Sequence, residues 1–74
     1  MKFDSRRADV IGYLEFIWRT DVPRPEGVRP QAIALITEAP GGRFQGMYGL
    51  RTVTGSTVAA VKEQLFSLIE EAGQ

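Results

Sequence analysis

The sequence predicts a small α+β domain, in which a three-stranded antiparallel β-meander carries one C-terminal amphipathic helix packed on one face. Three observations predict this β-β-β-α order. Segment 55–74 repeats apolar residues at helical spacing. Segments 31–38 and 43–53 are strand-like runs on either side of a Pro-Gly-Gly turn, and segment 8–20 is rich in β-branched and aromatic residues. At this length, we expect a single domain, 1–74.

The C-terminal helix is predicted from a single apolar stripe. The stripe residues recur at steps of three and four: Val58, Val61, Leu65, Leu68 and Ala72. Ser56 or Thr57 suits the N-cap position, and Gly73 suits the end of the helix. Lys62 falls outside the stripe, so we expect it in solvent.

The glycine-rich stretch EAPGGRFQGMYGLRT (38–52) predicts a hairpin rather than a phosphate-binding loop. Pro40 suits the second position of a type II turn, and Gly41 suits the third, where φ must be positive. A P-loop needs Lys and then Ser or Thr after its last glycine, but Met47 and Tyr48 stand at those positions. The G-x-G-x-x-G pattern of dinucleotide-binding loops is also missing.

Strand alternation divides segment 43–53 into two faces. The set that we expect in the core beneath the helix is Phe44, Gly46, Tyr48 and Leu50. The set that we expect on the opposite face is Arg43, Gln45, Met47, Gly49 and Arg51. A glycine inside a strand, such as Gly46, indicates a bulge or the close approach of another part of the chain.

Segment 8–20 is compatible with two structures. As a strand, it would direct one set inward: Val10, Leu14, Phe16 and Trp18. The set directed outward would be Ile11, Tyr13, Glu15, Ile17 and Arg19. As a helix, it would give the alternative order α-β-β-α, but Gly12 would cost that helix about 1 kcal/mol, so the strand is favoured. The residues before it are expected to be frayed, and segment 20–31, with three prolines, predicts a loop.

Composition argues against several classes of function. The chain has no histidine and no cysteine, so disulfides and the usual zinc ligands are absent, and its scattered acids form no calcium-loop pattern. We therefore expect no enzymatic activity, no cofactor and no metal. A formal net charge of zero disfavours nucleic acid as the partner. We expect a cytoplasmic location, because neither a signal peptide nor a membrane-spanning run is evident.

A face of the sheet without a helix is the expected binding surface. The candidate partner-binding residues on it are Tyr13, Ile17, Arg19, Arg43, Met47 and Arg51. An apolar centre with an arginine rim is typical of protein interfaces, and a sheet edge offers a second route through strand addition. We expect a protein-binding module that acts as an inhibitor, an antitoxin-like protein or an adaptor, of the kind that phages or mobile elements encode. The alternative is a nucleic-acid-binding regulator that uses an arginine and aromatic sheet face.

Self-association is a further expectation. A domain of this size buries only about 60% of its unfolded surface, so its core is thin. Burying a second apolar surface would add stability, and we therefore expect a homodimer or a larger homo-oligomer.

One segment has a resemblance to a known family. MYGLRTVTGSTVAAVKEQL (47–65), a strand that runs into a helix start, resembles the hairpin-to-helix part of HicB-type antitoxins over about a quarter of the chain. Val58 and Ala59 replace the acidic–alanine pair that follows the threonine in that family. The resemblance implies an antitoxin-like role.

Overall fold

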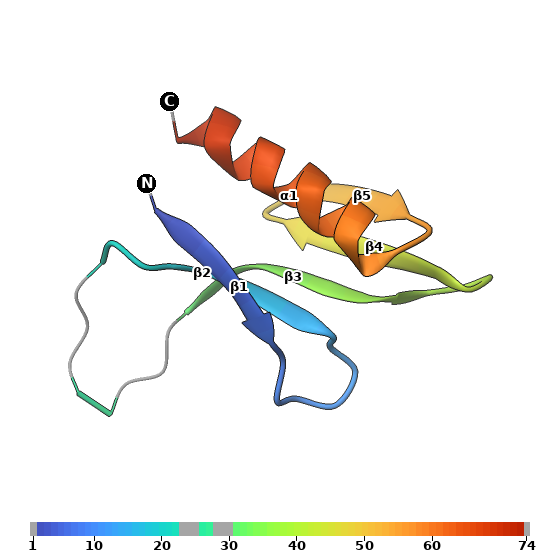
Figure 1. Ribbon diagram of the computed structural model, residues 1–74, viewed down its shortest axis with the longest axis horizontal. Helices are drawn as coiled ribbons and strands as arrows, with labels where there is room; N and C mark the ends of the chain where they lie inside the picture. Colours follow the sequence, from blue (N-terminus) through green and yellow to red (C-terminus); the bar gives the residue numbers. More distant parts are fainter. Residues whose placement is uncertain (1, 23–25, 28–30, 74) are drawn as a thin grey trace.

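The computed structural model describes residues 2–22, 26–27 and 31–73 of the chain. The elements follow the chain as β1 (Phe3–Arg7), β2 (Glu15–Arg19), β3 (Ala32–Ala39), β4 (Arg43–Tyr48), β5 (Arg51–Gly55) and α1 (Val58–Ala72). The strands form one antiparallel sheet in chain order, β1-β2-β3-β4-β5 (Figure 1). The predicted α+β class and C-terminal helix are confirmed. The prediction of three strands is wrong, because the described residues form five, and the alternative α-β-β-α order is also wrong.

Two strands account for the difference. β1 has the sequence FDSRR, with one apolar residue and no apolar alternation, so its side chains do not indicate a strand. The segment expected to be frayed is instead an edge strand paired to β2. The predicted strand 43–53 is divided by a two-residue turn at Gly49 and Leu50. Gly49 has a φ of 60°, which favours glycine at the first position of a tight hairpin turn. Leu50, which we expected in the core, is fully exposed in this turn.

Segment 8–20 is a loop in its first half and β2 in its second half. Tyr13 N donates to Val10 O at 3.2 Å, which closes a four-residue turn. Gly12 has a φ of 96° at the third position of this turn, as a type II turn requires. Ile11 is therefore fully exposed at the tip. The predicted loop 20–31 falls within the described residues only at 20–22, 26–27 and 31.

The helix forms where its stripe and caps predict it. Thr57 is the N-cap residue, and its hydroxyl oxygen accepts from Ala60 N at 3.1 Å, while Gly73 N donates to Ile69 O at 3.0 Å at the other end. The buried apolar side chains of the described residues come from the helix and the central strands: Ile17, Ala34, Ile36, Val61, Leu65 and Ile69.

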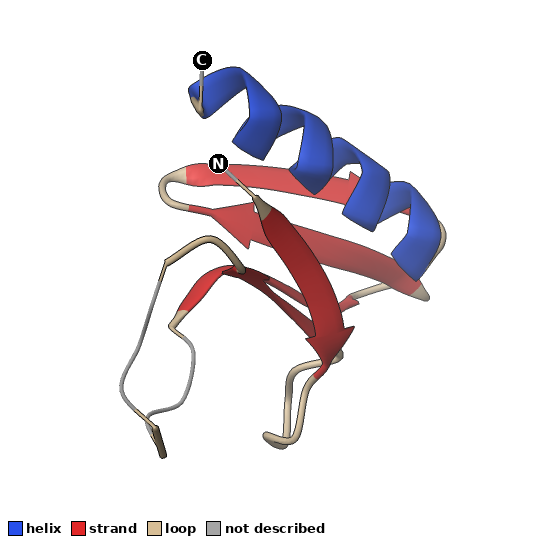
Figure 2. Cartoon of the chain, turned by 60° about the vertical axis from the view of Figure 1, so that its left-hand side comes forward, coloured by secondary structure: helices blue, strands red, loops and turns tan. Residues whose placement is uncertain are grey.

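Gly46 explains how closely the helix approaches the sheet. A Cβ atom built on Gly46 would lie 2.7 Å from Val61 Cγ1 and 2.7 Å from Leu65 Cδ1. The glycine in this strand therefore marks close packing, as the sequence indicated, and α1 lies directly over β4 and β5 (Figure 2). Figure 2 also shows the β1–β2 hairpin projecting beyond the helix.

β2 has the opposite orientation from the predicted one. Ile17 is fully buried on the helix side of the sheet, and Phe16 lies on the other side. Glu15 shares the side of Ile17, where its carboxylate binds Lys62 Nζ of α1 at 2.7 Å. The prediction placed Glu15, Ile17 and Lys62 on the outer surface, and this is wrong. The ion pair with Lys62 compensates the carboxylate of Glu15 on the core side. Because strand alternation has a period of two, this one assignment reverses the whole strand.

Candidate protein-interaction surface

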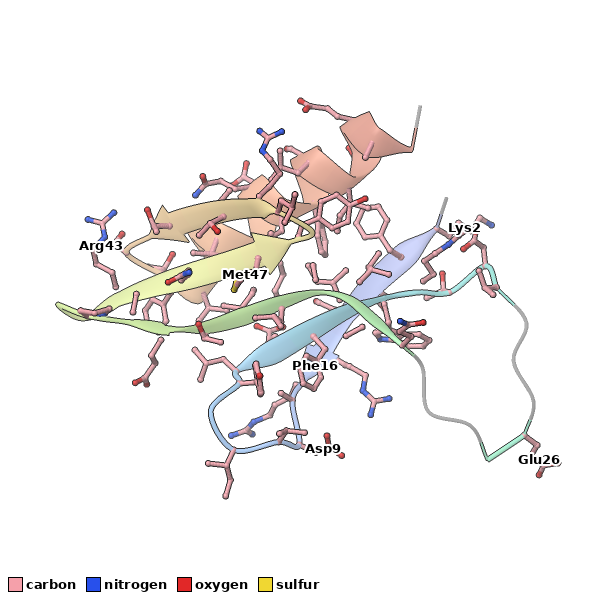
Figure 3. The ribbon with its side chains drawn as sticks, turned by 180° about the vertical axis from the view of Figure 1, so that it is seen from behind. Lys2, Asp9, Phe16, Glu26, Arg43 and Met47 are labelled. Carbon is pink, nitrogen blue, oxygen red and sulfur yellow. The ribbon has the colours of Figure 1, made fainter. Side chains whose placement is uncertain are left out.

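The face of the sheet opposite α1, which we call the open face, has no element of the described chain over it. Gly46 and Ile17 point toward the helix, so their neighbours Met47 and Phe16 point away from it. Strand pairing places one residue from each strand in a row across the middle of this face: Arg6, Phe16, Leu35, Met47 and Thr52. Figure 3 views the molecule from the side away from the helix and labels Met47 and Phe16.

The open face is apolar in the centre and polar at both edges. The three central strands contribute Phe16, Leu35 and Met47 to the row, whereas the outer strands contribute Arg6 and Thr52. Met47 is 41% exposed, and Phe16 and Leu35 are half-buried. A central apolar patch with a polar rim is the composition of a protein interface.

Tyr13 extends the apolar centre beyond the sheet. It lies in the loop between β1 and β2, is 40% exposed, and its ring centroid is 5.4 Å from that of Phe16. Trp18, two residues after Phe16 and paired with Asp4 of β1, adds a second large ring to the same face. The open face therefore carries aromatic, aliphatic and thioether side chains.

Three of the six candidate partner-binding residues lie on or beside the open face. Met47 is at its centre, Tyr13 contacts Phe16, and Arg43 is an exposed residue at the start of β4 on the side of Met47 (Figure 3). The sequence prediction missed Phe16, Trp18 and Leu35. The predicted strand 8–20 directs the first two into the core, because its faces are reversed relative to β2. Leu35 lies in a run of apolar residues that does not alternate.

The other three candidates lie on the helix side. Ile17 has no exposed surface, which contradicts its expected outward position. Arg19 of β2 pairs with Phe3 of β1 and forms a salt bridge with Asp21. Arg51 begins β5 opposite Tyr48 instead of continuing the face of Met47, because the turn at Gly49 and Leu50 interrupts the predicted strand.

The Arg19–Asp21 pair has a measurable electrostatic signature. Arg19 Nε and Nη2 each donate to an Asp21 carboxylate oxygen at 3.0 Å. These hydrogen bonds lower the pKa of Asp21 from 3.8 to about 2. We expect Arg19→Met to bring the pKa of Asp21 back toward its ordinary value, as measured by NMR titration of its side-chain carboxyl. The stabilising effect of the pair is present above pH 4 and is lost as the pH falls toward 2, because the folded-state pKa is the lower one. An Asp21 pKa that does not change in the variant would show that the pair does not persist in solution.

At each edge of the sheet, a side chain hydrogen-bonds to a backbone group that points away from the neighbouring strand. Thr20 N donates to Lys2 O and Ala8 N donates to Leu14 O, both at 3.0 Å. The backbone groups of the even-numbered residues of β1 therefore hydrogen-bond to β2, and the backbone N–H and C=O of Ser5 point away from it. Ser5 N donates instead to Asp4 Oδ1 at 2.8 Å.

At the other edge, Tyr48 and Arg51 flank the two-residue turn and form a hydrogen-bonded pair. The alternating pairing therefore directs the backbone N–H and C=O groups of Thr52 and Thr54 away from β4. Thr54 O accepts from Gln64 Nε2 of α1 at 2.9 Å. These contacts each engage one outward-pointing backbone group, on β1 and on β5, and disfavour the strand-addition route at those positions.

A shallow depression of about 600 Å³ lies between β5 and α1, with Arg51, Val53 and Leu68 among its lining residues. Among the described residues, no group of three or more His, Cys, Asp or Glu side chains could hold a metal ion. The described part of the chain also contains no helix that is both long and apolar enough to cross a bilayer.

Comparison of the chain with protein-family models, with curated proteins and with solved structures found no match.

Proposed function

We propose that this protein is a non-enzymatic cytoplasmic binding module that acts by covering a surface of another protein with its open face, as an inhibitor, an antitoxin-like protein or an adaptor. The observation that supports this proposal is the row across the five strands, with Phe16, Leu35 and Met47 between polar ends. Large apolar side chains that remain accessible on a structured face gain free energy when a partner removes them from water.

The rigidity of this face also suits protein binding. Its side chains stand on paired strands, and the opposite side of the same strands is packed against α1 through buried residues such as Ile36 and Leu65. A face held in this way loses little conformational freedom on binding, so more of the contact energy appears as affinity. Residues at the centre of such a patch are those that dominate binding.

We expect Met47→Glu to weaken partner binding by about 2 kcal/mol, or about 30-fold in Kd, because it places a charge at the centre of the apolar patch. The measurement is a tagged pull-down from the native host, read by quantitative mass spectrometry, followed by interferometry with each protein that is captured. Leu50→Glu is the matched control, because Leu50 is a fully exposed aliphatic residue in the turn between β4 and β5, outside the open face.

A partner retained by wild type and by Leu50→Glu but lost by Met47→Glu supports the proposal. A partner that both variants retain equally would contradict it, because the open face would then not be the binding surface. Circular dichroism of both variants excludes unfolding as the cause of a loss.

The second candidate function is single-stranded nucleic-acid binding, which Phe16 and Trp18 favour. Two rings on one open sheet face, with Arg6 beside Phe16, can stack bases and contact phosphate. Asp4 beside Trp18 and the zero net charge of the chain disfavour it. A gel shift with single-stranded oligonucleotides separates the two functions. A complex that is lost in Phe16→Ala and weakens steeply with added salt would favour nucleic acid, and the protein-binding proposal expects no shift.

A further inference from the structure

We infer that, in the absence of another partner, a second copy of this chain packs face to face on the open face. The inference rests on the proposed function, because it names an occupant of the same surface. It also makes self-association and the capture of a different protein mutually exclusive. The resulting dimer has four layers, with the two sheets about 10 Å apart in the middle and one helix on each outer side.

The first argument is the small core. Six apolar side chains are buried among the described residues, and all of them lie between the sheet and α1. The apolar side chains on the other side of the sheet are at most half-buried. A second copy would bury them and supply the second core that one chain of this size lacks.

The second argument is charge complementarity. Asp4 and Arg6 lie two residues apart on β1, so both project from the open face with opposite charges. A two-fold symmetric contact repeats each pair, so Asp4 of one copy opposite Arg6 of the second copy gives two ion pairs at once. The centre of the face, at Phe16, Leu35 and Met47, carries no charge that would repel its own copy.

The third argument is area. Strands of five to eight residues, at about 3.3 Å per residue and about 4.8 Å between strands, give a face of about 400 Å² in projection. Side-chain relief and Tyr13 beside Phe16 enlarge it toward the 800 Å² or so that each partner contributes to a standard interface. The contact therefore belongs with the smaller specific interfaces, and we expect dissociation in the micromolar range.

The fourth argument is that the edges favour a closed assembly. Asp4 Oδ1 occupies Ser5 N at the β1 edge, and Gln64 Nε2 occupies Thr54 O at the β5 edge. Edge-to-edge growth of the sheet would have to break these hydrogen bonds. Packing through the open face removes its apolar side chains from water and leaves the hydrogen bonds of both edges intact. Because both copies use the same face, the assembly stops at two copies.

The test is sedimentation equilibrium of the untagged full chain from about 1 to 100 µM, the range in which a micromolar dimer dissociates. We expect the mass to rise from 8.2 kDa toward twice that value. Met47→Glu should raise the dimer Kd at least tenfold, because the charge enters the interface twice. Thr52→Glu, in the same row but at an exposed hydroxyl residue, should do the same without removing an apolar side chain. Leu50→Glu, outside the face, should leave the Kd unchanged.

Either of two results would overturn the inference. One is wild-type protein that stays at the monomer mass at about 100 µM. The other is a dimer that persists in both Met47→Glu and Thr52→Glu, which would place the contact elsewhere. Failure of the proposed function gives a different pattern, with self-association that depends on Met47 but no captured protein that does.

Discussion

Gly46→Val is expected to lower the free energy of unfolding by about 3 kcal/mol or more, which is a large share of the roughly 4–11 kcal/mol expected for a chain of this length. Even a single added Cβ at Gly46 meets Val61 Cγ1 and Leu65 Cδ1 at 2.7 Å, closer than such atoms can lie. Valine adds two further methyl groups, so the helix must move away from β4. Equilibrium urea unfolding, followed by circular dichroism, measures the loss.

Gln45→Val is the matched control for this substitution. It introduces the same side chain one residue earlier in β4, on the open face, where no helix packs. We expect its free energy of unfolding to stay within about 0.5 kcal/mol of wild type. Adding Leu65→Ala to Gly46→Val should recover part of the loss by removing one of the clashing side chains. Wild-type stability in Gly46→Val would contradict the packing of α1 on β4.

Ile17→Asp is expected to unfold the protein. Ile17 is fully buried between β1, β3 and the helix, so the change removes a packed side chain worth about 2–5 kcal/mol and places a carboxylate in an apolar site. Together these costs reach the expected stability of the whole domain. The loss of dispersed amide signals in a ¹H–¹⁵N correlation spectrum is the measurement.

Met47→Asp carries the same charge on the open face and is expected to keep the dispersed spectrum at low micromolar concentration. Its side chain has access to water, so the carboxylate remains solvated. The pair tests the orientation of β2 and β4 together. An unfolded Met47→Asp beside a folded Ile17→Asp would mean that the helix covers the other face of the sheet.

Parts of this fold could be predicted because local chemistry determines them. The helix follows from its apolar stripe and the Thr57 cap, and the β3–β4 turn follows from Pro40 and the positive φ of Gly41. The faces of β4 were also predicted correctly, with Gly46 beneath the helix and Met47 on the opposite face. Each of these features is specified within a few residues of sequence.

The missed features depend on contacts that are distant in sequence. β1 is recognisable only from its backbone pairing to β2, because its side chains show no apolar alternation. The orientation of β2 places Ile17 in the core with the helix, and Lys62 neutralises Glu15 on the same side from 47 residues further along the chain. For the candidate surface, Met47 could be identified because β4 was correctly oriented. Tyr13 was predicted from an outward position in a strand, but it lies in the loop before β2. Phe16 could not be, because both faces of β2 carry large apolar residues.

The order of the strands has a consequence for how the chain folds. Each strand pairs with its neighbour in sequence, and α1 begins just after β5 and packs back on β4 and β5. Each strand pairing therefore closes only the loop between two strands that are neighbours in sequence. The contacts that span most of the chain join the N-terminal hairpin to α1. They include Phe3 with Phe66 and Glu15 with Lys62, and Ile17 shares the core with the helix. During synthesis the N-terminal hairpin can therefore pair with β3 before α1 is made, and its contacts with the helix are the last to form.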